Sequence, residues 1–452
     1  MRLKLAAIAA AAFVASAAAH SPMPAGQASQ LALQTFDAAW SIINTTYYDE
    51  TFRGVDWNAV RDEFRPQAER AATPGELRAT IEKMMDRLGE SHFAVLPQGP
   101  DSSDSAGDSL DRSGGPGFDV RPDGDALVVT RVLARSPAAA HVRAGDRLIA
   151  IAGTPASTLT ARIPADLEPR MRSLEIWRAA MMRLRGPIGS RLDLQLASVS
   201  GTTRAVTIER MNEPGASVML GNLPPMKLDV ETAAVETPAG ASAGLVRFNV
   251  WMAGADAPIA KAIDRFRTAR GIVIDLRGNP GGLAGMIMGI SGHFFDERKE
   301  LGRMKTRTSP DGLIFYANPR RSTADGRSVE PFAGPVAILI DGLTGSASEC
   351  FAGGMQSVGR ARVFGETSMG QALPASFTRL PNGDTLLHAI ADFVTADGTR
   401  LEGRGVVPDE IVPMDRKALA DGRDPVLGAA LAWIDRQAGP GQRDLKPAQP
   451  LW

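Results

Sequence analysis

The stretch VAILIDGLTGSASE, residues 336–349, joins a short apolar run to a turn of small residues and the start of a helix. The unbroken run Val336–Asp341 is typical of a strand buried on both faces of a parallel sheet. Residues 342–345 then turn the chain, and Ser346 stands where a helix to about Val358 begins. In open α/β sheets, sites form at this edge of the sheet. Ser346 is therefore a candidate nucleophile.

Two roles fit Ser346. The first amides of a helix are unpaired and attract negative charge, which suits the oxyanion of an acyl transfer. However, Ser346 and Glu349 also fit an S-x-x-E capping box, in which the serine only caps the helix. The local pattern does not decide between these two roles.

A second apolar strand, Gly271–Asp275, ends in the glycine-rich sequence DLRGNPGG, residues 275–282. The adjacent glycines Gly281 and Gly282 would let the backbone approach a ligand and direct an N–H at it. An ordinary glycine turn has the same composition. Strands and helices alternate on both sides of this segment, which predicts an α/β domain over residues 213–437.

The preceding segments differ in pattern. Residues 27–97 contain apolar residues at helical spacing and predict an N-terminal helical domain. Residues 98–115 are rich in Gly, Ser and Asp and indicate a linker. Short strands and turns then fill residues 113–212, which predicts a β-rich domain. The expected fold class is α/β and multidomain.

The two ends of the chain have their own compositions. Arg2 and Lys4 precede an apolar run over residues 5–15, and Ala17–Ala19 fits a small-residue cleavage site. The run is shorter than the ~20 residues of a membrane span. These features predict a signal peptide over residues 1–19, a periplasmic or secreted protein and no stable membrane span. Residues 438–452 are rich in Pro and Gln and predict a loose tail.

Composition disfavours several classes of function. Lys plus Arg number 50 and Asp plus Glu number 51, so no basic field exists to bind nucleic acid. Phosphate-binding glycine patterns and paired CxxC motifs are absent from the sequence, and neither a cofactor nor a metal is expected. Cys350, the single cysteine, has no partner for an intrachain disulfide and is expected to be buried on a helix.

Four motifs together resemble the C-terminal processing (tail-specific) serine proteases, a family that also includes the tricorn protease core and the retinoid-binding repeats of photoreceptors. They are DLRGNPGG at 275–282, TGSASE at 344–349, GRARVFGE at 359–366 and EGRGVVPD at 402–409. The resemblance implies a ClpP/crotonase-like catalytic domain with Ser346 as nucleophile. It also implies an oxyanion hole made by the N–H of Ala347 and that of Gly281 or Gly282.

The general base departs from this family pattern. Processing proteases carry a lysine 25 positions after the serine, where this chain has Gln371, and a neutral amide cannot take the serine proton. The tricorn-like branch uses a histidine from a Ser-His pair and a glutamate before G-V-x-P-D. The matching residues are Ser91, His92 and Glu402. The resemblance implies His92 as base, supported by Glu402 and Ser91. We expect a histidine pKa near ~6.5, moved upward by Glu402.

Residues 113–212 resemble a PDZ domain. Gly115, Pro116, Gly117 and Phe118 stand where PDZ domains have their carboxylate-binding loop, and residues 136–138 and 144–148 match the later helix and strand. PDZ domains add a peptide as an extra strand and hold its C-terminal carboxylate with backbone amides. A PDZ-like shell without peptide binding is the alternative, because an insertion over residues 167–185 leaves the groove undefined.

The resemblance implies a serine-type endopeptidase that acts on unfolded or C-terminally recognised polypeptides through an acyl-enzyme. Two alternatives remain open. One is a non-catalytic ligand- or peptide-binding protein on the same fold, which the loss of lysine at position 371 favours and the retention of Ser346, His92 and Glu402 opposes. The other is a hydrolase of other esters or amides, because a fold does not fix a substrate.

Overall fold

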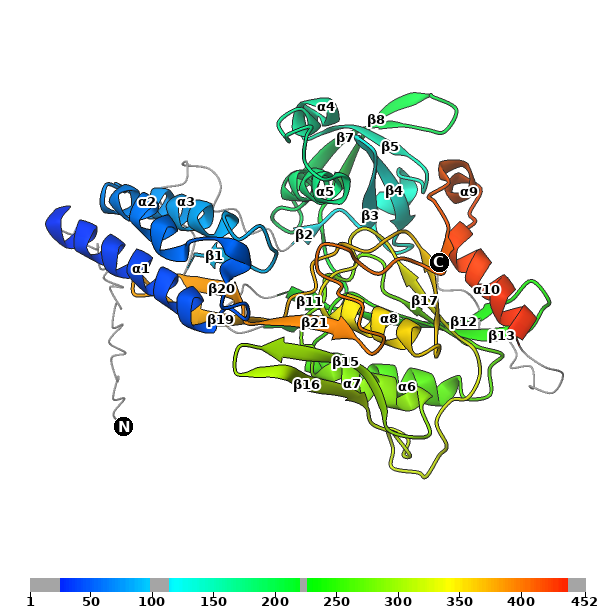
Figure 1. Ribbon diagram of the computed structural model, residues 1–452. Helices are drawn as coiled ribbons and strands as arrows, with labels where there is room; N and C mark the ends of the chain where they lie inside the picture. Colours follow the sequence, from blue (N-terminus) through cyan, green and yellow to red (C-terminus); the bar gives the residue numbers. More distant parts are fainter. Residues whose placement is uncertain (1–24, 98–113, 220–225, 438–452) are drawn as a thin grey trace, which may run out of the picture.

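A computed structural model describes residues 25–97, 114–219 and 226–437 (Figure 1). The predicted signal peptide over residues 1–19 and the predicted tail over residues 438–452 lie outside the described residues, as does most of the predicted linker. Within the described ranges, no helix combines the length and the apolar character that crossing a membrane requires.

The N-terminal region forms three helices, α1 (Ala25–Thr46), α2 (Trp57–Glu69) and α3 (Pro74–Asp86). Asp56 and Thr73 begin α2 and α3 by accepting hydrogen bonds from the amides of Ala59 and Glu76, as N-cap residues do. Aromatic and aliphatic side chains, among them Phe36, fill the space between the helices. Helices thus account for most of residues 25–86.

This region does not complete its core from residues 27–97 alone. The hairpin β19 (Ala375–Arg379) and β20 (Thr385–Ala389) packs against the helices, and β1 (Ala94–Leu96) pairs with β20. Figure 1 shows these orange strands beside the blue helices. The hairpin region places Leu373, Leu380, Leu386 and Ala389 in the helical core. The sequence boundary at residue 97 thus does not coincide with the boundary of the packed unit.

The β-rich region is built on a sheet of order β3-β4-β5-β7-β8, with β6 paired to β5. Its strands are β3 (Phe118–Asp123), β4 (Ala126–Val132), β5 (Arg147–Ile151), β6 (Thr154–Pro155), β7 (Arg191–Ala197) and β8 (Thr203–Glu209). Buried and exposed residues alternate along β7, as on a sheet with one covered face. The short helix α4 (Ala156–Thr160) precedes α5 (Pro169–Leu184), whose Ile176, Ala180 and Leu184 join the core with Phe118 and Val120 of the edge strand β3.

The C-terminal region is built on a sheet of order β12-β13-β14-β17-β18-β22, parallel from β13 to β22. Its strands are β12 (Val230–Glu236), β13 (Ser242–Phe248), β14 (Ile272–Asp275), β17 (Val336–Ile340), β18 (Arg362–Gly365) and β22 (Glu410–Ile411). One face packs on α6 (Asp256–Arg265), α7 (Met286–Ser291) and α8 (Ala347–Ser357), and the other on α10 (Pro425–Gln437). Covering on both faces explains why β14 and β17 are continuous apolar runs.

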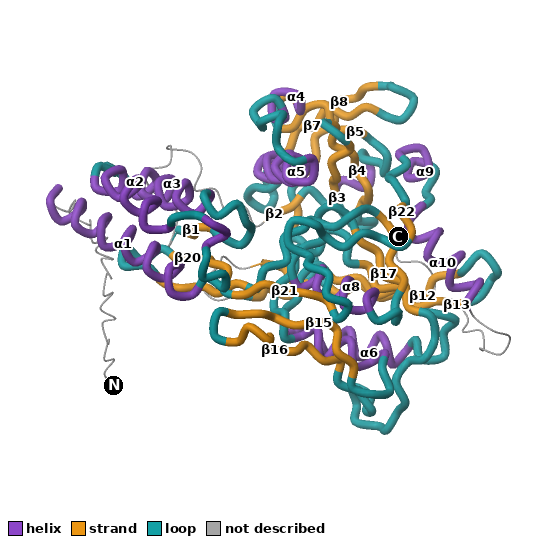
Figure 2. The backbone as a smooth tube through the Cα atoms, in the orientation of Figure 1, coloured by secondary structure: helices purple, strands orange, loops and turns teal. Residues whose placement is uncertain are grey.

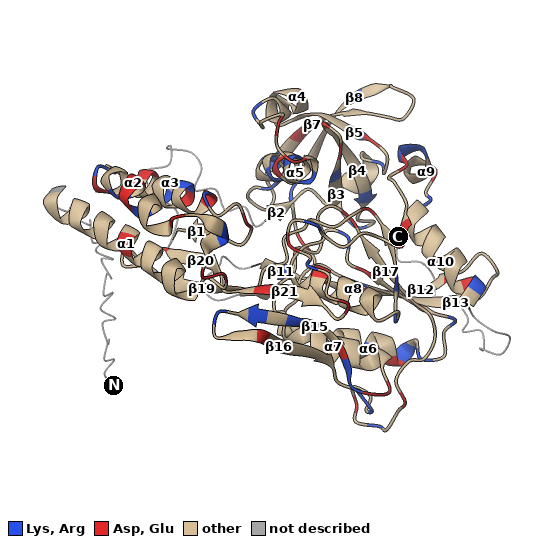
Figure 3. Cartoon of the chain, in the orientation of Figure 1, with Lys and Arg blue, Asp and Glu red and all other residues tan. Residues whose placement is uncertain are grey.

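Three further pieces of structure surround this sheet. One is a sheet of order β16-β15-β21, made of β16 (Ser309–Ala317), β15 (Lys299–Thr306) and β21 (Ala391–Thr395). The second is the strand pair β10 (Ala216–Val218) and β11 (Met226–Leu228), and the third is the helix α9 (Arg416–Ala420). Figure 2 shows a band of loops between α8 and the β-rich region. Figure 3 shows Lys and Arg intermixed with Asp and Glu along the chain, in line with its net charge of −1.

Candidate active site

Ser346 stands between the end of β17 and the first residue of α8, as the sequence predicted. Its backbone has φ 54° and ψ −120°, a conformation that is uncommon outside glycine and costs of order 1–3 kcal/mol. The surrounding structure holds this turn. The Ser346 amide lies 2.8 Å from the Gln371 carbonyl and 3.0 Å from Glu349 Oε2. The Asp341 carboxylate accepts from the amides of Gly278 and Leu343.

Glu349 provides the carboxylate half of the predicted capping box, but it binds more than the Ser346 amide. The residue is fully buried and accepts four hydrogen bonds. Its donors are Ser346 N at 3.0 Å, Gln371 N at 3.0 Å, Gly370 N at 2.6 Å and Ser368 Oγ at 2.6 Å. Burial raises the pKa of Glu349 to about 7, against the opposing effect of these donors. Glu349 thus fastens the serine turn to residues 368–371.

His92 approaches Ser346 from the segment between α3 and β1. His92 Nε2 lies 3.2 Å from Ser346 Oγ, although the two residues are 254 positions apart in the chain. His92 has φ 62°, so its backbone is also in the left-handed region that few residues other than glycine adopt. Two strained residues therefore bring an imidazole and a hydroxyl into hydrogen-bonding range.

The other ring nitrogen of His92 leads to Glu402 through Ser91. His92 Nδ1 lies 2.7 Å from Ser91 Oγ, which lies 3.0 Å from Glu402 Oε2. The Ser91 amide donates to Glu402 Oε1 at 2.8 Å, and the Ala372 amide donates to Oε2 at 2.8 Å. The four predicted site residues Ser346, His92, Ser91 and Glu402 thus form one continuous chain of polar contacts. Within it, Ser91 contacts the imidazole of His92, and Glu402 does not.

The expected upward pKa shift of His92 is wrong. Desolvation by the surrounding protein lowers the pKa of His92 to about 4, because a charged imidazolium loses its hydration there. Ser91 separates the ring from the Glu402 carboxylate, so that charge does not offset the desolvation. Burial in turn raises the pKa of Glu402 above its ordinary value, opposed by the hydrogen bonds from Ser91 and Ala372.

The glycine turn lies directly against the serine. A Cβ atom placed on Gly281 would be 2.6 Å from Ser346 Cβ and 2.9 Å from Ala347 N, so no side chain fits there. The Gly281 amide donates to Asn279 Oδ1 at 3.0 Å. Of the predicted oxyanion donors, the Gly281 N–H is therefore already engaged. Ala347 and Gly282 remain the candidate pair.

Three side chains near Ser346 make contacts outside the chain of polar contacts from Ser346 to Glu402. Gln371 Nε2 donates to Met171 Sδ at 3.4 Å. Cys350 is buried on α8, as predicted. Ser348, two positions after Ser346, is buried and accepts a hydrogen bond of 2.8 Å from Trp251 Nε1. Ser348 thus serves the packing of α8 on Trp251.

The predicted carboxylate-binding loop lies in the β-rich region. Gly115, Pro116, Gly117 and Phe118 are all buried. Gly115 belongs to β2 (Gly114–Gly115), which pairs with β9 (Met211–Asn212), and a Cβ atom on it would meet the Glu213 side chain. Phe118 begins β3, the edge strand that faces α5. The loop thus adjoins the edge strand β3, which shares a core with α5.

Helix α5 connects the β-rich region to the candidate site, a contact that the sequence analysis missed. Arg170 donates to the carbonyls of Arg404 and Gly403 at 2.5 Å and 2.7 Å, directly after Glu402. Leu174 packs with Leu343 and Met369, which lie in the loops that lead to Ser346 and Gln371. The insertion over residues 167–185 therefore covers the loops that carry Ser346, Gln371 and Glu402. No sequence motif signalled this.

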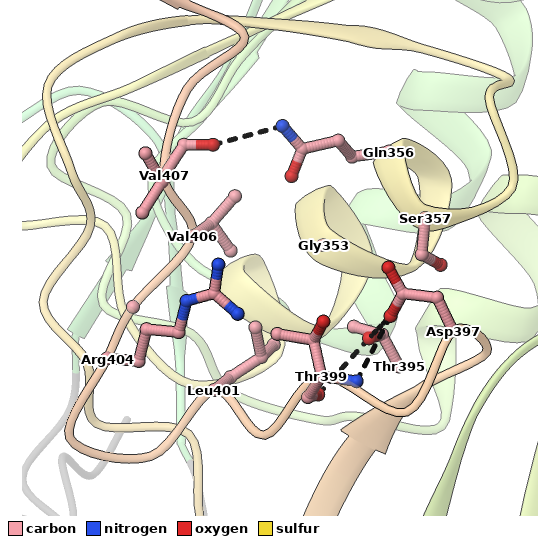
Figure 4. Close-up of a pocket in the computed structure, with 11 residues that line it drawn as sticks. Gly353, Gln356, Ser357, Thr395, Asp397, Thr399, Leu401, Arg404, Val406 and Val407 are labelled. Carbon is pink, nitrogen blue, oxygen red and sulfur yellow. Dashed lines mark hydrogen bonds between the residues drawn. The ribbon is translucent and has the colours of Figure 1, made fainter.

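A separate hollow of about 290 Å³ lies between α8 and the loop over residues 395–407 (Figure 4). It is lined by Gly353, Gln356, Ser357, Thr395, Asp397, Thr399, Leu401, Arg404, Gly405, Val406 and Val407. The lining includes neither Ser346 nor His92. Asp397 accepts hydrogen bonds from Thr395 Oγ1 and the Thr399 amide, and Gln356 donates one to the Val407 carbonyl. These contacts shape the loop that carries Glu402.

Two protein-family models and several proteins of known activity are similar to this chain. The model of peptidase family S41 matches residues 242–412, and that of the tricorn protease C1 domain matches residues 32–86. A carboxyl-terminal-processing protease of Picosynechococcus is 28% identical over 385 residues, covering 83% of this chain and 82% of that protein. Tricorn protease homolog 1 of Streptomyces coelicolor is 26% identical over 419 residues, covering 88% of this chain and 34% of that protein.

The fold also matches solved structures. The photosystem II D1 C-terminal processing protease superposes with a TM-score of 0.56 at 22% identity, over 89% of this chain and 98% of that one. Fold and matched models together define a serine-type peptidase. Residues 242–412 match peptidase family S41, and over most of its length the chain is similar to carboxyl-terminal-processing proteases. The predicted family and fold class are confirmed, whereas the PDZ identity and the individual catalytic residues stay predictions.

Proposed function

We propose that this peptidase is an exported endopeptidase that cleaves unfolded or C-terminally recognised polypeptides with Ser346 as nucleophile and His92 as base. The contact chain from Ser346 through His92 and Ser91 to Glu402 carries the proposal, since it supplies a base at the position where the family lysine is replaced by Gln371. The arrangement needs no further group to activate the serine.

The hydrogen-bond partners assign the protons. Neutral His92 accepts a hydrogen bond from Ser346 Oγ at Nε2 and donates one from Nδ1 to Ser91 Oγ. The Ser91 hydroxyl in turn donates a hydrogen bond to the Glu402 carboxylate. When Ser346 Oγ attacks the peptide carbonyl carbon, its proton passes to His92 Nε2. Ser91 and Glu402 hold the ring in orientation and stabilise the resulting imidazolium.

The remaining steps follow from the same groups. The carbonyl oxygen becomes an oxyanion that the N–H groups of Ala347 and Gly282 stabilise at the start of α8. His92 then gives its proton to the leaving amine, and the C–N bond breaks to leave an acyl ester on Ser346. Water, deprotonated by His92, attacks this ester, and His92 then gives that proton to Ser346 Oγ as the ester C–O bond breaks and releases the acid. The enzyme is then back in its starting state, with a neutral His92 and a Ser346 hydroxyl.

The β-rich region is proposed to select substrates. It presents the edge strand β3 beside α5, and Gly115–Phe118 stand at the start of that strand. An extended peptide added to β3 would place its terminal carboxylate at these residues. The contacts of Arg170 and Met171 near Glu402 and Gln371 put the same helix in touch with the catalytic loops.

Ser346→Ala is expected to abolish both peptide hydrolysis and labelling by a fluorophosphonate probe, because the attacking oxygen is removed. Ser348→Ala is the matched control: it leaves labelling intact but destabilises the fold by about 1–3 kcal/mol, since it leaves the Trp251 N–H buried without an acceptor. Gel labelling and chemical unfolding measure the two effects. Labelling of the Ser346→Ala protein would place the nucleophile elsewhere.

The pH dependence of kcat/KM is expected to follow the lowered pKa of His92. The base works when neutral, so activity should rise through about pH 4 and stay level across neutral pH, rather than rise near 6.5. Glu402→Gln should lower the rate while moving this midpoint little, because desolvation dominates the pKa. A pH–rate profile of both proteins, with a stability check at each pH, tests this. A midpoint at 6.5 or above contradicts it.

Substrate selection through the C-terminal carboxylate has a direct test. A long unfolded substrate whose C-terminus is amidated should show a raised KM with little change in kcat, because amidation alters the end that Gly115–Phe118 are proposed to bind and not the bond that Ser346 attacks. A short chromogenic peptide is the control and should be unaffected by amidation. Equal KM values for the free acid and the amide of the long substrate would refute carboxylate capture.

Export is proposed from residues 1–19, and it predicts the first residue of the mature chain. When the full-length gene is expressed in a bacterium with a general secretion pathway, intact mass should correspond to a chain that begins after Ala19, in the periplasm or medium. A replacement of Arg2 and Lys4 by neutral residues should slow export. A full-length chain that stays with the cytoplasmic fraction would contradict the proposal.

A further inference from the structure

Glu90, the residue before Ser91, is a buried carboxylate to which the reaction steps above assign no role. Its side chain is 2% exposed. Four side chains surround it, each with a donor on one of its oxygens: Tyr47 Oη, Tyr48 Oη at 2.8 Å, Arg53 Nη1 at 2.6 Å and Arg400 Nη2 at 2.7 Å. A buried charge is retained only where such partners replace its hydration.

Arg400 connects this carboxylate to the loop of Glu402. Its Nη2 donates to Glu90 and to the Tyr48 hydroxyl, and its Nη1 donates to the backbone carbonyl of Glu402 at 3.3 Å. Its Nε is fixed by Asp392 Oδ2 at 2.7 Å on β21. One guanidinium therefore binds the residue before Ser91 and the residue Glu402 itself, across 310 positions of sequence.

The geometry points to Glu90 as a positioning residue for the catalytic relay, acting with Arg400 to set the approach of Ser91 and His92 to Glu402. This inference rests on the proposed roles of His92 and Glu402. Glu90 touches neither substrate nor the reacting atoms. It fixes the chain at the point where Ser91 presents both its amide and its hydroxyl to Glu402.

If Glu90 only stabilised the N-terminal region, all of its hydrogen-bond partners would belong to that region. Tyr47, Tyr48 and Arg53 belong to that region and hold Glu90 in place. Arg400 belongs to the catalytic segment, and its second contact is to Glu402. Since displacement of a catalytic group by about 1 Å costs on the order of 10²-fold in rate, loss of this tether should be measured in the chemical step.

The test is Glu90→Gln, which keeps the shape of the side chain and removes its charge. We expect kcat for a peptide, and the first-order rate of fluorophosphonate reaction with Ser346, to fall by about 10- to 10²-fold while KM changes less than about twofold. Rates are expressed per folded protein, determined by circular dichroism and gel filtration. Glu63→Gln is the control, because its 2.6 Å pair with Arg87 lies on the exposed surface of the same region and should leave rates unchanged.

Two further variants separate positioning from general loss of structure. If Glu90 acts through Arg400, Glu90→Gln/Arg400→Met should be no slower than the slower single variant. Tyr48→Phe removes one donor to Glu90 and keeps every charge, so it should give a smaller loss of the same kind and remains usable if Glu90→Gln folds poorly. Parent rates in both Glu90→Gln and Tyr48→Phe, or fully additive losses in the double variant, would overturn the inference. Failure of the proposed roles of His92 and Glu402 would show separately, as a parent rate in Glu402→Gln.

Discussion

The hydrogen bonds to the Glu402 carboxylate are the contacts on which the rest of the site depends. One oxygen accepts from the Ser91 amide, and the other accepts from the Ser91 hydroxyl and the Ala372 amide. These bonds join the segment after α3 to the segments on either side of β19 to β21. A carboxylate taken out of water in this way is stable only with its donors in place, so the three segments are ordered together.

A second buried carboxylate, that of Glu349, binds the turn that carries Ser346 in the same way. Glu349 binds the Ser346 amide and three donors from residues 368–371. Since Ala372 follows this segment and binds Glu402, the two carboxylates are connected by one short stretch of backbone. Strain at Ser346 and at His92 is thereby held by charge-assisted hydrogen bonds rather than by packing alone.

The sequence predicted the parts whose signals are local. The apolar runs at β14 and β17, the turn before Ser346 and the helical N-terminal region are recognisable from periodicity and small residues. The resemblance supplied the relation between His92, Glu402 and Ser346, which no spacing could show. Contacts made across domains left no local mark, so the cover of α5 over the catalytic loops and the hairpin β19–β20 in the helical core were missed. The pKa of His92 was mispredicted because its sign depends on burial and on the intervening Ser91. The engagement of the Gly281 amide had a readable signal, an asparagine two positions earlier in the turn.

The shared core of the N-terminal helices has a consequence for the order in which the chain matures. The helices are synthesised first, but Leu386 and Ala389 of their core follow almost the whole catalytic segment. His92 lies on the strand side of that core, next to β1, which needs β20 as its partner. A partly made chain thus lacks both the partner strand of β1 and the serine that His92 meets. A chain truncated before the hairpin would therefore lack the partner strand of β1, which follows His92, and would also lack Glu402, which binds Ser91.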